Sequence, residues 1–156
     1  MRFKTIGGAE GPEGFELVEY VREYLKLNSE YKIRLYLGTD SQNKQNSTTY
    51  ATTLVFHIGN TGCHVVYNKD VVKRIPVKDY YNRLWGEVER SVETALYLRG
   101  NGIEVTHVGL DLNSDPNRKS HKLLAAAKGY VEAYRFKCKV KPDMLPAIKA
   151  ADDLAR

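Results

Sequence analysis

The chain is 156 residues long, and 42% of its residues are apolar while 28% are charged. This length and composition suit one globular domain with a buried core and exclude a long disordered protein. No apolar run approaches the roughly 18 residues of a membrane-spanning helix, and the first residues lack the apolar stretch of a signal peptide. We therefore expect a cytoplasmic protein that has no contact with a membrane and whose two cysteines, Cys63 and Cys138, are buried, reduced thiols.

The net charge of +5 is distributed unevenly along the chain. Residues 10–30 hold six acidic and two basic side chains, whereas residues 116–141 hold eight basic side chains and one acidic one. Such dense positive charge favours a polyanionic partner, and nucleic acid is the leading candidate. The alternative is a solvated helix face and edge strand, which is what most charge runs are.

The first half of the chain predicts one helix followed by three strands. Residues 12–27 place apolar side chains at the spacing of one helix face, which indicates an amphipathic helix. The polar stretch 41–49 predicts a loop after the first strand, and the turn residues 59–62 predict a hairpin between the second and third strands. The expected strands, which alternate or are rich in β-branched and aromatic residues, are 32–40, 50–58 and 63–69.

The second half alternates helices with strands. Apolar residues between Tyr81 and Leu96 share one stripe, which predicts a long helix over 78–99. A final helix is expected after Pro142, with Asp143 as its cap. The other expected elements are a strand over 103–112, a helix over 118–134 and a strand over 136–140.

This order of elements predicts one α/β fold. Three antiparallel strands followed by two strand–helix units give a mixed five-stranded sheet flanked by helices, with right-handed crossovers. We expect residues 1–30 to form a leader and an acidic helix packed on a domain of residues 31–156.

Two expected strands end in the same pattern, Gly38-x-Asp40 and Gly109-x-Asp111. Each glycine lies on the same sheet face as its aspartate and leaves space beside the carboxylate. Two carboxylates at neighbouring strand ends repel each other, so a cation or a shared proton is needed to keep them together. The alternative for either aspartate alone is a short polar residue that starts a turn.

The helices offer further oxygen ligands. Asp152 shares a helix face with the apolar residues of the last helix, which favours it over Asp153. Glu87 and Glu89 flank the apolar stripe of the long helix on opposite sides, and the helical wheel does not separate them. A solvated glutamate on a helix flank is the commoner case for either.

Several short motifs occur in an order that resembles a known family. These motifs are GTDSQ at 38–42, LDLN at 110–113, KS at 119–120 and KPD at 141–143, followed by AAD ending at Asp152. Over residues 33–153 the chain resembles the YkuK-type family of predicted RNase H-like nucleases. The RNase H-like superfamily, which includes RuvC-type resolvases, places acidic residues on the first strand, first long helix, fourth strand and last helix.

The resemblance implies a nuclease that depends on divalent metal and hydrolyses phosphodiester bonds at a two-metal carboxylate site. It assigns the metal ligands and catalytic residues to Asp40, Glu87, Asp111 and Asp152, with Glu89 in reserve for Glu87. Mg²⁺ or Mn²⁺ suits such an all-carboxylate site. Ser41 and Gln42 are interpreted first as turn residues and second as phosphate contacts. The remaining expected contacts to nucleic acid, either RNA or DNA, are Asn113, Lys119, Ser120 and Lys122.

The chain departs from ribonuclease H enzymes in one respect. Those enzymes often carry a histidine on the loop before the final helix, and residues 141–144 contain none. A two-metal site can work without that histidine, because the metals themselves activate water. Two alternatives remain: a non-catalytic module that binds nucleic acid or protein on this scaffold, and an ATP-binding protein related to actin and sugar kinases. The second needs glycine-rich phosphate loops, which the sequence lacks.

Overall fold

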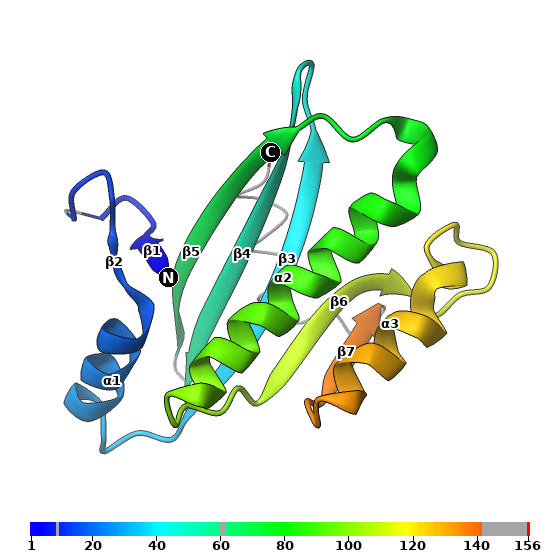
Figure 1. Ribbon diagram of the computed structural model, residues 1–156. Coiled ribbons are helices and arrows are strands. Elements are labelled where there is room, and N and C mark those ends of the chain that lie inside the picture. The colour runs from blue at the N-terminus through cyan, green and yellow to red at the C-terminus, as the bar shows by residue number, and fades with distance from the viewer. Residues whose placement is uncertain (9, 60–61, 142–155) are drawn as a thin grey trace.

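The computed structural model describes residues 1–8, 10–59, 62–141 and 156 (Figure 1). Its centre is a mixed sheet in the order β2-β1-β5-β4-β3-β6-β7. The strands are β1 (Arg2–Thr5), β2 (Phe15–Glu16), β3 (Ile33–Asn43), β4 (Ser47–Ile58), β5 (Gly62–Lys73), β6 (His107–Asn113) and β7 (Cys138–Lys141). The helices are α1 (Leu17–Leu27), the short 3₁₀ turn η1 (Val77–Asp79), α2 (Tyr80–Gly100) and α3 (His121–Ala133).

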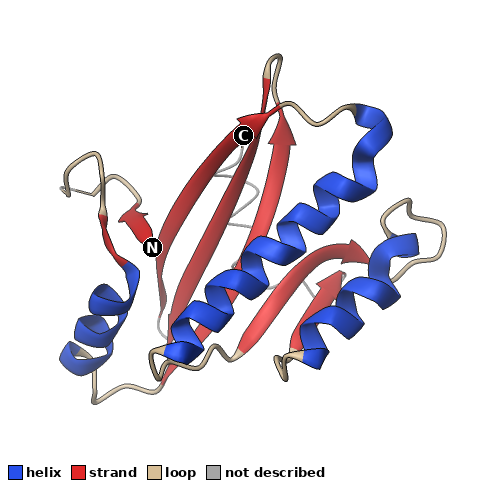
Figure 2. Cartoon of the chain, in the orientation of Figure 1, coloured by secondary structure: helices blue, strands red, loops and turns tan. Residues whose placement is uncertain are grey.

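The five strands from β3 to β7 have the predicted arrangement. β3, β4 and β5 form an antiparallel meander, and β6 and β7 join β3 in parallel. The connections from β5 to β6 and from β6 to β7 carry α2 and α3, which lie on one face of the sheet (Figure 2). The mixed α/β fold is therefore confirmed.

Among the described residues the sheet has seven strands, so the predicted count of five was wrong. The two extra strands come from the leader and from the first residues of the expected acidic helix. β1 pairs with β5 through Lys4↔Tyr67, and its Phe3 is 1% exposed in the core. The helix expected from residue 12 begins only at Leu17, where Glu16 caps it by accepting a hydrogen bond from the Val18 N–H.

The prediction of a loop over residues 41–49 was also wrong. β3 continues to Asn43 and β4 begins at Ser47, so the two strands stay paired past Asp40. Thr48 and Thr49 are buried in this extension, and Thr48 donates a hydrogen bond to the Asn43 side chain. Polar residues that satisfy one another across the ladder stay in strands although they add little apolar surface. Ser41 and Gln42 are therefore strand residues, and their interpretation as turn residues was wrong.

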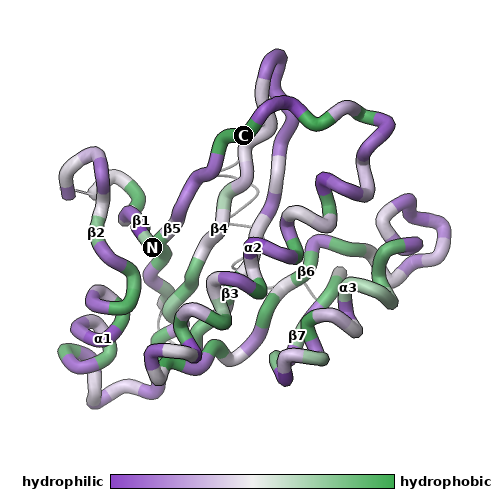
Figure 3. The backbone as a smooth tube through the Cα atoms, viewed as in Figure 1, coloured by the Kyte–Doolittle hydropathy of each residue, from purple (hydrophilic) through white to green (hydrophobic). Residues whose placement is uncertain are grey.

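Most of the predicted stripe of α2 is buried against the sheet. Leu84, Val88, Val92 and Ala95 are at most 5% exposed, whereas Tyr81, Trp85 and Leu96 are half-buried. Figure 3 shows hydrophobic residues at the lower ends of β3 and β4, whereas the turn joining these strands is hydrophilic. The core thus holds α2 tightly along β3, which fixes the position of any side chain that α2 directs at the strand.

Three smaller expectations have mixed outcomes. Cys138 is half-buried, but Cys63 is exposed at the start of β5, so its predicted burial was wrong; both are free thiols. The expected final helix, including Asp152, lies outside the described residues. Within the described part of the chain, no helix is long and apolar enough to cross a membrane.

Candidate metal centre

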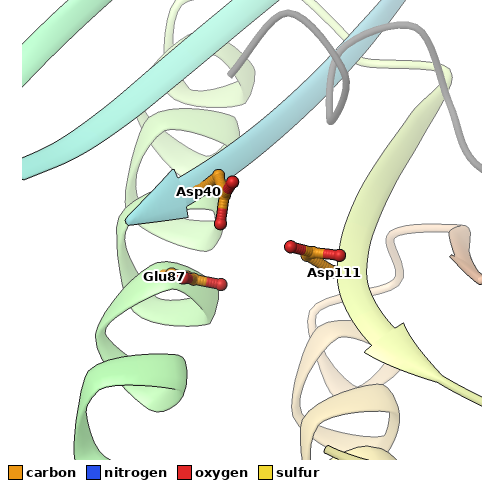
Figure 4. Close-up of side chains that lie close together, drawn as sticks. All are labelled: Asp40, Glu87 and Asp111. Carbon is orange, nitrogen blue, oxygen red and sulfur yellow. The ribbon is translucent and has the colours of Figure 1, made fainter. Parts of the chain in front are cut away.

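Three carboxylates from three different elements meet beside the sheet. Asp40 lies on β3, Glu87 on α2 and Asp111 on β6, and one carboxylate oxygen of each lies within 4.8 Å of those of the other two. Figure 4 shows the three side chains pointing toward one another. Asp40 and Glu87 are only 5% and 4% exposed. Such a cluster of buried acids is costly unless a proton or a cation compensates it.

The register of the sheet explains why the two aspartates meet. β3 and β6 are parallel, and Gly38 pairs with Gly109. Asp40 and Asp111 each lie two residues beyond that pair and therefore occupy equivalent positions on the two strands. The pairing of β6 with β7 is irregular between Leu110 and Asn113, and irregularities of this kind redirect side chains.

The structure separates Glu87 from Glu89. Glu87 is buried beside the aspartates, whereas Glu89 is exposed on the other flank of α2. There Glu89 lines a cavity of about 530 Å³ together with Arg90 and Asp70, which form an ion pair. Size alone would favour that cavity as the site, but its charges are of both signs, and Arg90 and Asp70 pair with each other. The carboxylate cluster is the stronger candidate because three carboxylates converge there.

Ser41 and Arg83 hold Glu87 in place through a chain of hydrogen bonds. The Ser41 hydroxyl donates to Glu87 Oε2 at 2.5 Å. Arg83 Nη1 lies 2.9 Å from both the hydroxyl and the carbonyl oxygen of Ser41 and donates to them. The Ser41 N–H donates to Asp40 Oδ1 at 2.8 Å. Ser41 thus connects two of the three acids. This role of Ser41 was not predicted, since the strand that turns Ser41 toward α2 was expected to be a loop.

The electrostatics of Glu87 reflect its surroundings. Burial raises the pKa of Glu87 well above its ordinary value, and the neighbouring Asp40 and Asp111 raise it further. The hydrogen bond from Ser41 and the charge of Arg83 oppose this rise in the pKa. In the absence of a cation, Glu87 therefore favours its protonated form, and a divalent cation would reverse that preference.

Tyr50 holds this part of α2 against β4. Its hydroxyl donates to the carbonyl oxygen of Arg83 at 3.2 Å. A Cβ at Gly86 would lie 2.5 Å from the same hydroxyl oxygen, so only glycine allows this close approach. Glu87 follows Gly86 directly, and the contact therefore sets the height of the carboxylate above the sheet.

The residues expected to contact nucleic acid lie in different environments. Lys119 and Lys122 are exposed before and within the first turn of α3, and Lys119 Nζ lies 4.1 Å from the centre of the Tyr80 ring. Ser120 and Gln42 are half-buried, while Ser41 is 2% exposed and engaged with Glu87. Asn113 ends β6, two residues beyond Asp111.

Comparison with known families now places the chain. The family model described as Ribonuclease H-like matches residues 16–156. The chain belongs to the ribonuclease H-like family. A search of curated proteins and a search of solved structures each gave no match. The family match covers every strand from β3 to β7, and β1 precedes it.

Proposed function

We propose that this ribonuclease H-like protein is a nuclease that hydrolyses phosphodiester bonds with the help of divalent metal ions. One observation carries the proposal: Asp40, Glu87 and Asp111 converge from three elements into one buried cluster. A family match alone would not carry it, because one fold hosts many functions.

The donor set fits Mg²⁺ or Mn²⁺. All three groups are carboxylates, and hard divalent ions prefer oxygen ligands. Asp40 and Asp111 would hold the ions between them, Glu87 would complete one side, and Asp152 is retained as a fourth ligand from the family resemblance. The bound ions would stabilise the negative charge that develops on the reacting phosphate oxygens.

The protein's own residues would position these ligands and the substrate. Ser41 and Arg83 hold the Glu87 carboxylate in place through the hydrogen bonds described above. Lys119 and Lys122 would contact the phosphate backbone, assisted by Gln42, Asn113 and Ser120. Contacts to phosphate carry no sequence information, so we expect selection by the shape of the nucleic acid.

We further propose that this activity is cytoplasmic. Cys63 and Cys138 are free thiols, and thiols persist in a reducing compartment.

The test is an incubation with labelled single-stranded, duplex, hybrid and branched substrates, with and without Mn²⁺. We expect at least one substrate to be cleaved only when Mn²⁺ is present, and the Asp40→Asn variant to be inactive. If the wild-type protein and the Asp40→Asn variant bind nucleic acid equally and neither cleaves it, the protein is a non-catalytic binding module and the nuclease proposal is wrong.

A further inference from the structure

A row of basic and aromatic side chains crosses the sheet on the face away from α2. Side chains along β3 alternate between the two faces of the sheet. Leu35 and Leu37 are buried in the core, and Arg34 and Tyr36 therefore lie on the opposite face. Arg34 pairs with His57 on β4, and Tyr36 pairs with His107 on β6. Directly paired residues share a sheet face. We call this set, with Lys137 and Lys139 from the β7 segment, the basic sheet face: Arg34, Tyr36, His57, His107, Lys137 and Lys139.

The rings of this face lie in a row. The ring centroids of Tyr36 and His57 are 5.9 Å apart, and those of Tyr36 and His107 are 6.0 Å apart. All three residues are half-buried, so each ring keeps part of its surface accessible. Beside them, a small cavity of about 150 Å³ is lined by Lys32, Arg34 and His57.

Cations surround these rings. Lys139 pairs with Gly109, two residues beyond His107, and so belongs to the same face. Arg34, Lys137 and Lys139 are exposed, and none of them forms an ion pair with an acid among the described residues. Burial lowers the pKa of His107, and the three charges that lower it further are those of Lys139, Lys137 and Arg34. Positive charge thus converges here from β3 and β7, which are far apart in the sequence.

The part of the basic sheet face around Arg34 lies away from the metal centre. Arg34 precedes Asp40 by six residues on one continuous strand. At the rise of an extended strand this is a separation of about 20 Å. A ligand at Arg34 would therefore reach the carboxylates only if it were several nucleotides long, whereas Lys139 pairs with Gly109, two residues before Asp111.

We propose that the basic sheet face binds a single-stranded segment of nucleic acid. Arg34, Lys137 and Lys139 would contact its phosphates, and the rings of Tyr36, His57 and His107 would lie against its bases. Cations interleaved with rings on a sheet match a chain of phosphates and stacking bases. A lipid surface would use the cations but not the row of rings. This inference goes beyond the proposed nuclease activity because it requires no cleavage.

The test compares two double variants that remove the same charge. Arg34→Gln with Lys139→Gln alters the basic sheet face, whereas Lys26→Gln with Lys128→Gln removes two exposed cations from α1 and α3. Binding of a labelled oligo(dT) of about 30 nucleotides is measured by fluorescence anisotropy in EDTA over a range of salt. We expect the first variant to lower the slope of log affinity against log salt by about 0.7 per lost contact. The control should retain nearly the wild-type slope.

Two results would overturn the inference. One is an equal salt slope in the two double variants. The other is unchanged oligonucleotide binding by Arg34→Gln with Lys139→Gln while sedimentation with anionic phospholipid vesicles is lost, which would assign the face to a membrane. Charge reversal, Arg34→Glu with Lys139→Glu, should weaken oligonucleotide binding further, and its circular dichroism melt verifies that it is folded.

Failure of this inference can be told apart from failure of the nuclease proposal. A dinucleotide is too short to reach from the carboxylates to Arg34, so Arg34→Gln alone should cleave it in Mn²⁺ at the wild-type rate. Cleavage lost in that variant alone would place Arg34 at the metal centre and overturn the inference. Cleavage absent from every protein, together with the expected salt slopes, would end the nuclease proposal and support the basic sheet face.

Discussion

At the scale of single residues, Glu87 is the most constrained group of the site. It is buried, lies near Asp40 and Asp111, and receives one short hydrogen bond from Ser41. Burial and like charge both favour its protonated form, so the pKa of Glu87 is raised. Without a cation, an ionised Glu87 beside Asp40 and Asp111 therefore lowers the free energy of unfolding, and bound cations would remove this destabilisation.

That cost gives a pH dependence with a definite sign. A carboxyl whose pKa is raised on folding contributes fully to stability below its unfolded value, near 4.5, and loses that contribution as the pH rises through the folded pKa. In EDTA, the free energy of unfolding of wild type minus that of Glu87→Gln should fall as the pH rises above about 4.5. Urea unfolding at several pH values measures this difference, and a difference that stays constant with pH would contradict the account.

Ser41 offers a second test at this scale. Ser41→Ala removes the donor to Glu87 Oε2 and one acceptor of Arg83. Loss of a group that orients a metal ligand typically costs about 10- to 100-fold in metal affinity. We expect Mn²⁺ affinity to fall by about tenfold, as measured by calorimetry, while Ser29→Ala on the exposed surface leaves it unchanged. Equal affinities in the two variants would show that Ser41 does not position Glu87.

At the scale of elements, the site depends on how closely α2 approaches the sheet. Gly86 lies against Tyr50, which is 2% exposed and has the Arg90 guanidinium 3.7 Å from its ring centre. Gly86 and Arg90 thus both pack against Tyr50 and fix its position. The glycine is needed for close packing, although it lowers the intrinsic stability of the helix.

Gly86→Ala and Gly129→Ala form a matched pair. The new methyl group at 86 would overlap the Tyr50 ring, and overpacking of this kind costs about 1–3 kcal/mol. At Gly129 on α3 the methyl group meets nothing within 4 Å, so the substitution should stabilise the protein by about 0.5–1 kcal/mol. Urea unfolding of both variants checks the opposite signs. A stabilised Gly86→Ala variant would mean that α2 is not held at this height.

Particular elements show how far the sequence can predict this architecture. The glycine two residues before each aspartate was visible in the sequence, and the parallel register does place Asp40 beside Asp111. The helical wheel did not separate Glu87 from Glu89, and only the family resemblance favoured Glu87, because the choice depends on the rotation of α2 that packing against Tyr50 helps to set. β1 was missed because its four residues gain their stability from pairing with β5, which is distant in the sequence. The role of Asp152 stays a prediction.

At the scale of the whole molecule, the basic segment of the sequence divides into two surfaces. Lys119 lies near the start of α2 through its contact with the Tyr80 ring. Lys137 and Lys139 instead join Arg34 on the basic sheet face. Because α2 and α3 lie on the other face of the sheet, a nucleic acid that contacts both surfaces would pass around an edge of the sheet.

Replacing Lys119 and Lys122 with alanine should separate binding from chemistry. Two lost phosphate contacts would lower the salt slope of affinity by about 0.9 each on duplex DNA, or about 0.7 each on single strands. The rate of cleavage at saturating substrate should change little, because neither lysine is a metal ligand. Anisotropy and single-turnover kinetics measure the two quantities. An unchanged slope would leave these lysines as solvated surface charges.

The central claim is that the buried carboxylates bind divalent metal, and a calorimetric titration with Mn²⁺ tests it most directly. We predict that the wild-type protein and Glu89→Gln bind Mn²⁺ alike, because Glu89 lies on the other flank of α2. Glu87→Gln and Asp111→Asn should each lose most of this binding while remaining folded. Equal Mn²⁺ binding by all four proteins, or none by the wild type, would contradict the account.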